Sequence, residues 1–282
     1  MGATGSNVIK NEVKSTARKA ANSPLMEALD RLGYGTRGLI YIMMGILSLS
    51  VVLGKGGAPA SQQGAIAAIG KQPAGLILLW IILLGLVSYA LWGVIRAVLD
   101  PLRKGHDLKG LIARAGYLVS AASYFFLVPF TYGYITGSGS SGEASMQKSM
   151  ASMMSSPAGH WAVVVIGLAV IANGLYQVYI GLNASFDKQF QTYAMNAKEI
   201  RWATQLGRFG TASRGVIFAI VGVLLTQAGL QSNPNQGVGF DSALTALLQQ
   251  PYGVWLLGIV ALGFMAFGVF SMLSAVWFRA QK

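Results

Sequence analysis

Six apolar stretches recur along this chain, and none of their cores contains an aspartate or a glutamate. Each approaches the length of about 20 residues that an α-helix needs to cross a hydrocarbon layer of about 30 Å. Only 11% of the 282 residues are charged, whereas about 25% is usual in a soluble globular domain. The stretches therefore predict six membrane-spanning helices, at residues 36–54, 74–96, 115–136, 159–182, 212–231 and 252–278.

Two of these stretches are short. Their apolar cores run over Leu39–Leu53 and Val216–Leu230, so they span a bilayer only if Arg37 and Arg214 extend to the headgroups. Upstream of the first, Ser23 and the proline that follows it are typical of a helix start. We expect a separate short helix there, ending at Leu32.

The net charge of +12 is unevenly distributed. All but three of the 21 Lys and Arg residues fall on one side of the predicted spans, the exceptions being Lys55, Lys71 and Lys148. By the positive-inside rule this pattern predicts a multi-pass plasma (inner) membrane protein with cytoplasmic N and C termini. Attraction to anionic lipids at the cytoplasmic face follows. We expect no nucleic-acid partner, because no loop combines a dense basic patch with stacking aromatics.

An internal repeat underlies the six stretches. Arg-x-Gly begins at Arg31, Arg114 and Arg208, which lie 83 and 94 residues apart, and Pro-x-Gly begins at Pro73, Pro157 and Pro251, 84 and 94 apart. Two independent motifs keep nearly the same spacing, so we infer three two-helix units. The predicted organisation is a flexible basic tail at 1–24 and units at 25–109, 110–201 and 202–282.

The repeat constrains the architecture. Two spans per unit mean that every unit enters the membrane from the same side, and repeats of this parallel kind are related by an axis along the membrane normal. We expect an all-α integral membrane fold, a pseudo-three-fold bundle with a short amphipathic helix in each outer loop. Asp241 is expected to cap the third of these helices, and Pro129 to kink the third span.

The segments Gly33–Tyr41, its echo Gly210–Phe218, and Phe240–Gly253 resemble a known family. It comprises prokaryotic six-helix membrane proteins catalogued as a domain of unknown function, family twelve-oh-six. The resemblance covers about residues 25 to 280 and implies the same six-helix architecture. The middle unit departs from the pattern, with Ser120 where the other units have arginine. The family brings no established activity.

Five arginines are the candidate ligand-binding residues. Arg31, Arg114 and Arg208 are expected to form a cytoplasmic ring, with Arg37 and Arg214 one step deeper. Rings of arginine favour anions, and the guanidinium fork suits phosphate or carboxylate. The alternative is structural: these side chains anchor helix ends to lipid phosphate and to backbone carbonyls.

Two further sets of residues are assigned from their spacing. Small and aromatic side chains on shared helix faces are expected to pack helices together; these are Gly45, Gly85, Gly222, Gly263, Tyr41, Tyr124, Phe218 and Trp92. The fourth span is the most polar, with His160 near its outer end and Asn173, Tyr176 and Gln177 further in. These side chains hydrogen-bond a neighbouring helix or line a permeation surface.

Several classes of function are disfavoured. The chain has no cysteine and two histidines, and we find no nucleophile–base–acid set, so we expect no enzyme, no metal and no cofactor. The missing intramembrane carboxylate argues against proton-coupled transport. The leading hypothesis is a small-solute or ion pathway, for anions in particular. The alternatives are an accessory or scaffold subunit of a larger membrane complex, involved in stress, and a protein that binds anionic lipid.

Overall fold

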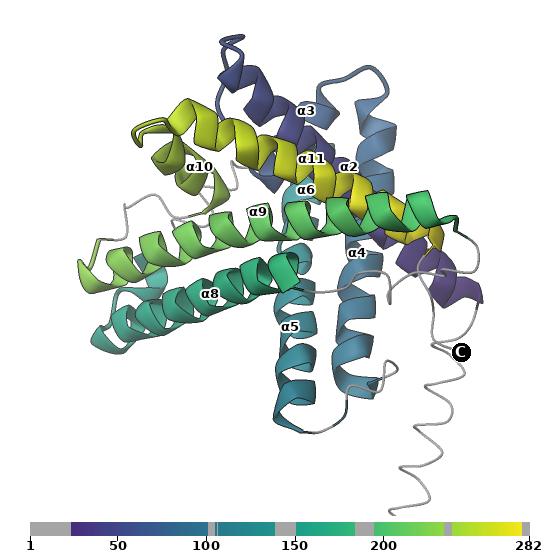
Figure 1. Cartoon of the computed structure of the whole chain (residues 1–282). Helices are drawn as coiled ribbons and strands as arrows, with labels where there is room; N and C mark the ends of the chain where they lie inside the picture. Colours follow the sequence, from purple (N-terminus) through teal and green to yellow (C-terminus); the bar gives the residue numbers. More distant parts are fainter. Residues whose placement is uncertain are drawn as a thin grey trace, which may run out of the picture.

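The computed structural model describes residues 24–100, 105, 107–138, 151–183, 195–233 and 239–277, so the predicted tail lies almost wholly outside it. Six of the described helical stretches are long and apolar enough to cross a membrane, which confirms the predicted number of spans. The helices in chain order (Figure 1) are α2 (Pro24–Val52), α3 (Gln62–Gly70), α4 (Gly75–Leu99), α5 (Leu108–Phe125), α6 (Leu127–Thr136), α8 (Pro157–Asn183), α9 (Ala197–Leu230), α10 (Phe240–Leu248) and α11 (Gly253–Trp277).

The first and fifth spans belong to longer helices than the sequence predicts. α2 runs through the expected break after Leu32 without interruption, so the separate short helix is wrong. α9 begins at Ala197, where Asn196 and Glu199 form a capping box that satisfies the first backbone N–H groups. The apolar pattern starts later because these first turns are polar.

The third span is broken, as Pro129 predicts. α5 ends at Phe125 and α6 begins at Leu127, with Phe126 between them. Proline has no N–H to donate to the carbonyl four residues earlier, and its ring crowds that carbonyl. The interruption therefore falls within the turn that precedes the proline.

Short helices α3 and α10 occupy corresponding loops between the two long helices of the first and third units, and rest on the core through Ile66, Ile69, Leu244 and Leu247. The prediction that Asp241 caps α10 is wrong. Asp241 lies inside the first turn of α10, whose N-cap is Gly239, and its Oδ1 instead accepts a hydrogen bond of 2.6 Å from the backbone N–H of Ser61. The carboxylate thus joins the third unit to the residue that caps α3.

The Pro-x-Gly motif makes the turn into the second helix of a unit. Its middle residue takes a left-handed conformation in two units, with φ of 63° at Ala74 and 62° at Tyr252. The glycine that follows has no room for a side chain, since a β-carbon on Gly75 would lie 2.5 Å from the carbonyl oxygen of Ile69. A tight backbone approach explains why this glycine recurs.

Glycine also sets the closest helix packing. On α8, Gly167, Gly174 and Gly181 recur at intervals of seven residues and lie against the backbone of α9. A β-carbon on Gly174 would stand 2.7 Å from the carbonyl oxygen of Gly215, and one on Gly215 would stand 2.7 Å from that of Gly174. Small residues at such positions let membrane helices approach until their backbones touch.

The same contact recurs between α2 and α11. A β-carbon on Gly38 would lie 2.8 Å from the carbonyl oxygen of Gly268, and one on Gly268 would lie 2.7 Å from that of Gly38. By the repeat spacing, Gly38 corresponds to Gly215 and Gly268 to Gly174. In both places, therefore, the first helix of one unit packs on the second helix of another through the same pair of contacting glycines.

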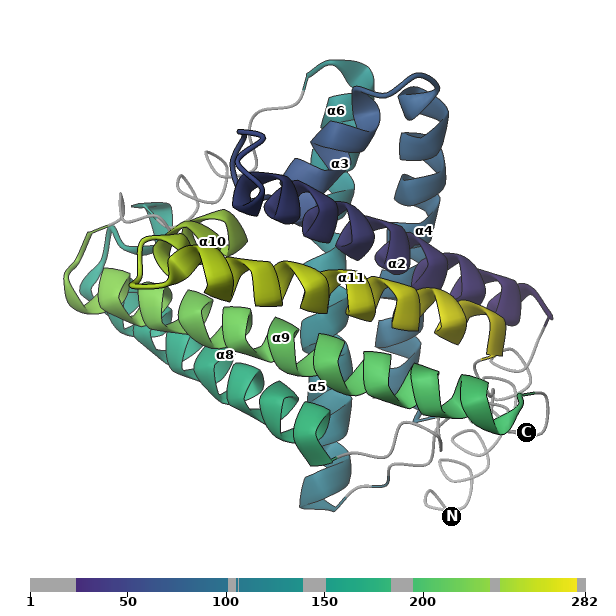
Figure 2. The same cartoon turned by 45° about the horizontal axis from the view of Figure 1, so that its top comes forward.

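Contacts within a unit also recur. A β-carbon on Gly33 would meet Tyr89 Cβ of α4 at 3.0 Å, and one on the corresponding Gly210 would meet Phe267 Cβ of α11 at 2.6 Å. The extensive interfaces run in the series α8–α9–α11–α2–α4–α5. Figure 2 shows α8, α9, α11 and α2 running side by side, with α4 and α5 crossing them steeply.

Candidate functional site: a buried arginine–tyrosine cluster

Arg37 lies in the interior of the helix bundle and is only 7% exposed. Its Nε donates a hydrogen bond of 3.0 Å to Ser271 Oγ on α11, and its Nη1 donates one of 2.8 Å to the hydroxyl of Tyr89 on α4. The ring centres of Tyr34, Tyr89 and Phe267 lie 4.8, 5.3 and 4.8 Å from its Cζ. Arg37 thus contacts side chains of neighbouring helices inside the bundle; its level relative to the headgroups stays a prediction.

Arg214 occupies the corresponding position on α9. Its Cζ lies 5.7, 5.1 and 5.1 Å from the ring centres of Tyr41, Phe218 and Phe267. Its Nε is buried and has no hydrogen-bond partner. Phe267 contacts both guanidinium groups, so the first and third units place two cations against one aromatic ring.

No carboxylate neutralises this pair among the described residues. The four described acidic side chains serve helix ends: Asp107 caps α5, Glu199 completes the capping box of α9, Asp100 accepts from Gly105 N–H, and Asp241 accepts from Ser61 N–H. An arginine at the centre of a bilayer costs about 2.5–3.5 kcal/mol on insertion scales. Ring faces and two neutral hydroxyls offset part of that cost, and an anion would offset more.

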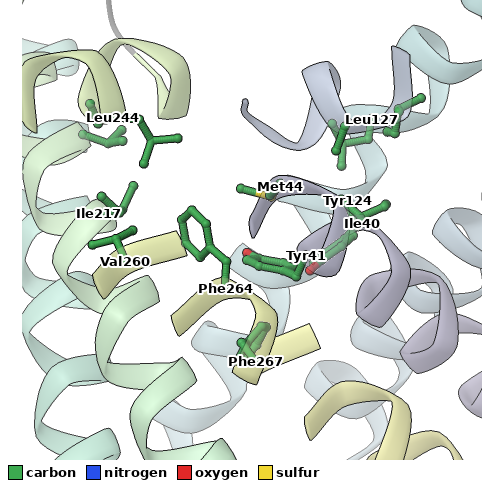
Figure 3. Close-up of a cluster of buried hydrophobic side chains, with 14 of the residues drawn as sticks. Ile40, Tyr41, Met44, Tyr124, Leu127, Ile217, Leu244, Val260, Phe264 and Phe267 are labelled. Atoms are coloured by element: carbon green, nitrogen blue, oxygen red, sulfur yellow. The ribbon is translucent and has the colours of Figure 1, made fainter. Parts of the chain in front are cut away.

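Tyrosine rings lie next to both arginines, Tyr89 next to Arg37 and Tyr41 next to Arg214. Figure 3 shows Tyr41 and Tyr124 within the buried cluster that also holds Phe264 and Phe267. The rings of Tyr41 and Phe267 have centres 4.8 Å apart, and those of Tyr124 and Tyr89 have centres 4.5 Å apart. These two pairs correspond by the repeat. The hydroxyl of Tyr124 is buried and has no hydrogen-bond partner, like Arg214 Nε.

Hydrogen bonds extend the cluster in both directions. On one side, Gln62 Nε2 of α3 donates to the Tyr41 hydroxyl at 3.1 Å. On the other, Arg96 Nη1, near the end of α4, donates to the Tyr34 hydroxyl at 2.9 Å. Polar groups therefore follow one another from α3, past the buried Arg37 and the half-buried Arg214, to the C-terminal end of α4.

The shallower arginines have backbone partners. Arg114 Nε donates to Ala97 O at 2.7 Å and its Nη2 to Val98 O at 3.2 Å. Arg208 makes the corresponding bonds to Gly181 O and Leu182 O. These carbonyls lie at the C-terminal ends of α4 and α8, where a cation also suits the helix dipole. Both side chains thus anchor helix ends, and Arg31 is exposed on α2.

The polar residues of the fourth span lie apart from the cluster. Tyr176 is 48% exposed, and His160, Asn173 and Gln177 are half-buried along α8. Within the described part of the chain, none of them hydrogen-bonds to Arg37 or Arg214.

The residues assigned to packing lie at helix contacts or in the core. Gly45 faces α11, Gly222 faces α8, Gly85 faces Thr36 of α2, and Gly263 faces Ser213 of α9. Tyr41, Tyr124 and Trp92 are buried, and Phe218 packs edge-on against Phe240 of α10, with ring centres 5.1 Å apart.

Arg96 is one of the members of the cluster that the sequence leaves unassigned, together with Gln62, Tyr89, Phe267 and Ser271. It is only 6% exposed, and its Cζ lies 5.0 Å from the centre of the Trp92 ring. Tyr89, Trp92 and Arg96 fall at i, i+3 and i+7 on α4, so one helix face carries all three. This spacing on one helix face could have identified Arg96 as a neighbour of the aromatic residues from the sequence alone.

The six spans and the recurring helix contacts define a multi-pass α-helical membrane protein with an internal two-helix repeat. The chain belongs to the family described as Domain of Unknown Function (DUF1206), which matches residues 32–100, 115–184 and 209–277. Each match falls within one predicted unit. The chain is also 32% identical to the uncharacterized protein YxxB of Bacillus subtilis (strain 168) over 259 residues, 92% of this chain and 94% of that protein. No solved structure matches the chain.

Proposed function

We propose that this protein binds a small anion at Arg37 and Arg214 and passes it across the membrane. The observation that carries the proposal is a pair of arginines inside the bundle without an ion-pairing carboxylate in the described residues. A bound anion supplies the missing negative charge. It also gives the unpartnered Arg214 Nε an acceptor and accepts from the unpartnered Tyr124 hydroxyl.

The geometry restricts the kind of anion. Aromatic rings cover the faces of both guanidinium groups, so a ligand meets their N–H edges. Edge-on recognition suits a carboxylate or another small oxyanion, which accepts two parallel hydrogen bonds, and a halide accepts at the same edge. A bulky anion does not fit among side chains as buried as Tyr41, Tyr124 and Phe267.

Passage, rather than binding alone, is supported by the polar groups on either side of the pair. Gln62 with Tyr41, and Tyr34 with Arg96, extend hydrogen-bonding groups toward both ends of the bundle. An anion moving between these positions exchanges one donor for the next without entering a wholly apolar region. Conduction needs several sites of moderate affinity of this kind.

We propose that the end of the bundle with Arg96, Arg114 and Arg208 faces the cytoplasm. The chain carries most of its Lys and Arg residues on that side of the spans. It follows that Gln62 lies at the outer mouth, that both termini are cytoplasmic, and that the membrane is the plasma membrane. The three units are proposed to surround the arginine pair with pseudo-three-fold symmetry.

The test is flux of chloride, formate, acetate and phosphate into proteoliposomes. Arg214→Met is the main variant, because Arg214 makes fewer hydrogen bonds than Arg37 and its loss is less disruptive. Arg201→Met is the matched control, an exposed arginine of the same helix, outside the predicted span. Losing a charge-assisted contact of about 1.5–3 kcal/mol slows flux by about 10- to 100-fold. Absence of flux for every anion, or equal flux in both variants, contradicts the proposal.

The second candidate is an accessory subunit of a larger membrane complex. The observation that favours it is the exposure of large apolar side chains along α5 and α8, including Phe125 and Phe126 beside the break and Trp161 on α8. A stoichiometric partner protein that stays bound through mild extraction from native membranes would support it. Recovery of this chain alone would leave the anion proposal as the better explanation.

A further inference from the structure

The helix interfaces form an incomplete ring. Three units arranged around an axis have six interfaces, three within units and three between them. Five of these are extensive: α2–α4 and α9–α11 within the first and third units, and α4–α5, α8–α9 and α11–α2 between units. The sixth would join α5 to α8 within the middle unit, and the described residues show no extensive interface there.

Of the two faces that would meet, the α5 face is exposed at Gly116 and the α8 face is half-buried at Asn173. Gly33 and Tyr89, and likewise Gly210 and Phe267, are buried against each other within their units. The corresponding residues of the middle unit are Gly116 on α5 and Asn173 on α8. Gly116 is exposed, and a β-carbon there would meet nothing within 4 Å. A glycine in a helix interior costs up to about 1 kcal/mol relative to alanine, and this one has no close neighbour to account for it.

The next contact along the interface follows the same pattern. Thr36 meets Gly85 in the first unit, and Ser213 meets Gly263 in the third. Their counterparts are Val119, 52% exposed, and Ala169, also exposed. The outer segment differs too, because Met153 is 42% exposed while its counterpart Ile69 is 3% exposed. At all three compared positions, the described residues of the middle unit thus lack the contacts that close the other two units.

We propose that α8 docks on α5 through these faces and closes the three units into a ring. The chemistry of the face favours a protein neighbour over lipid, because it carries the carboxamide of Asn173, which hydrocarbon cannot satisfy. The occupant is α8 of the same chain, since two equivalent interfaces already show the contact that it makes. Docking places Asn173 where the other units have Tyr89 and Phe267, which both contact Arg37.

Bilayer geometry supports closure independently. Spanning helices tilt by about 20° on average, within a range of about 0–40°. α4 and α5 cross the other four long helices steeply (Figures 1 and 2), so all six cannot span one bilayer in that arrangement. Docking of α5 on α8 aligns α4 and α5 with the rest.

Disulfide formation in membranes tests the contact, because the chain has no cysteine of its own. The test pair is Gly116→Cys with Asn173→Cys. The positive control is Gly33→Cys with Tyr89→Cys, whose β-carbons would lie 3.0 Å apart, near the spacing of about 3.5–4.5 Å that a disulfide needs. The negative control is Gly116→Cys with Leu175→Cys, since Leu175 is 60% exposed on another face of α8.

The expected result is a disulfide within one chain for the test pair, at a yield comparable with that of the positive control, as measured by mass spectrometry of linked peptides. A yield no higher than that of the negative control overturns the proposal. So does a disulfide that joins two chains, because the occupant of the face is then a second copy.

Gly116→Ala gives a second readout that leaves the core intact. If the α5 face stays exposed, the new methyl should raise the unfolding midpoint. The same increase is expected for Gly35→Ala, because a β-carbon at Gly35 also meets nothing within 4 Å. If α8 is docked on α5, the methyl should clash with α8 and lower the unfolding midpoint, as expected for Gly33→Ala. We expect the decrease, and an increase equal to that of Gly35→Ala overturns the proposal.

Discussion

Replacing Gly174 with alanine tests the backbone-to-backbone contact between α8 and α9. The new β-carbon would lie 2.5 Å from Ala219 N and 2.7 Å from Gly215 O, both backbone atoms of α9 that no side-chain rotation can move. Overpacking of this kind costs about 1–3 kcal/mol, and the better helix propensity of alanine returns up to about 1 kcal/mol. We therefore expect a net loss of roughly 1–2 kcal/mol in the free energy of unfolding.

Gly35→Ala is the matched control, because it makes the same chemical change inside α2 where nothing lies within 4 Å of the new atom. It should gain up to about 1 kcal/mol. Unfolding of both variants is followed by circular dichroism during titration of detergent-solubilised protein with sodium dodecyl sulfate. If Gly174→Ala is as stable as Gly35→Ala, α8 and α9 do not pack backbone to backbone and the reasoning fails.

Three other perturbations address separate features. Tyr89→Phe removes an acceptor from a buried guanidinium and should cost about 1–2 kcal/mol in the same titration; an unchanged midpoint would place that arginine elsewhere. Asp241→Ala leaves the Ser61 N–H without its acceptor and should cost about 1 kcal/mol, whereas a stabilised variant would show that the carboxylate does not join α10 to the start of α3. In intact cells, a cysteine at Gly56 should react with a membrane-impermeant maleimide and one at Lys104 should not; the reverse pattern would invert the proposed orientation.

The spans and the repeat were predictable from sequence because both depend on residues close together in the chain. Apolar length fixes where a helix can cross a membrane, and two short motifs at constant spacing reveal the units. Helix ends were less predictable. Gly33 follows Leu32 like a helix-ending residue, yet α2 continues through it, because this glycine admits the side chain of Tyr89 rather than ending a helix.

The candidate site was predictable only in outline. The sequence indicates that Arg37 lies deeper than Arg31, but its partner Ser271 is 234 residues away. That bond forms because α2 packs on α11. The glycines at 38 and 268 permit this close packing, but they do not identify from the sequence which helices pack together. Asp241 was misassigned for a related reason: its partner belongs to another unit, and local capping rules do not reach across units.

The repeat also explains why the site has two deep arginines rather than three. Ser120 stands where a third arginine would lie, and a third cation in one apolar core would add repulsion as well as desolvation cost. The substitution leaves a net charge that one or two small anions can balance.

Anion-linked stabilisation of the purified protein tests the central claim, a small anion bound at Arg37 and Arg214. The unfolding midpoint is measured with chloride, formate, acetate or phosphate replacing gluconate at constant ionic strength. At about 100 times its Kd, a ligand that binds only the folded state stabilises it by about 2.7 kcal/mol. At least one small anion should raise the midpoint of the wild type and of Arg201→Met, and not that of Arg214→Met. An unfolding midpoint that no anion changes, or that rises equally in Arg214→Met and the wild type, would contradict anion binding at this cluster.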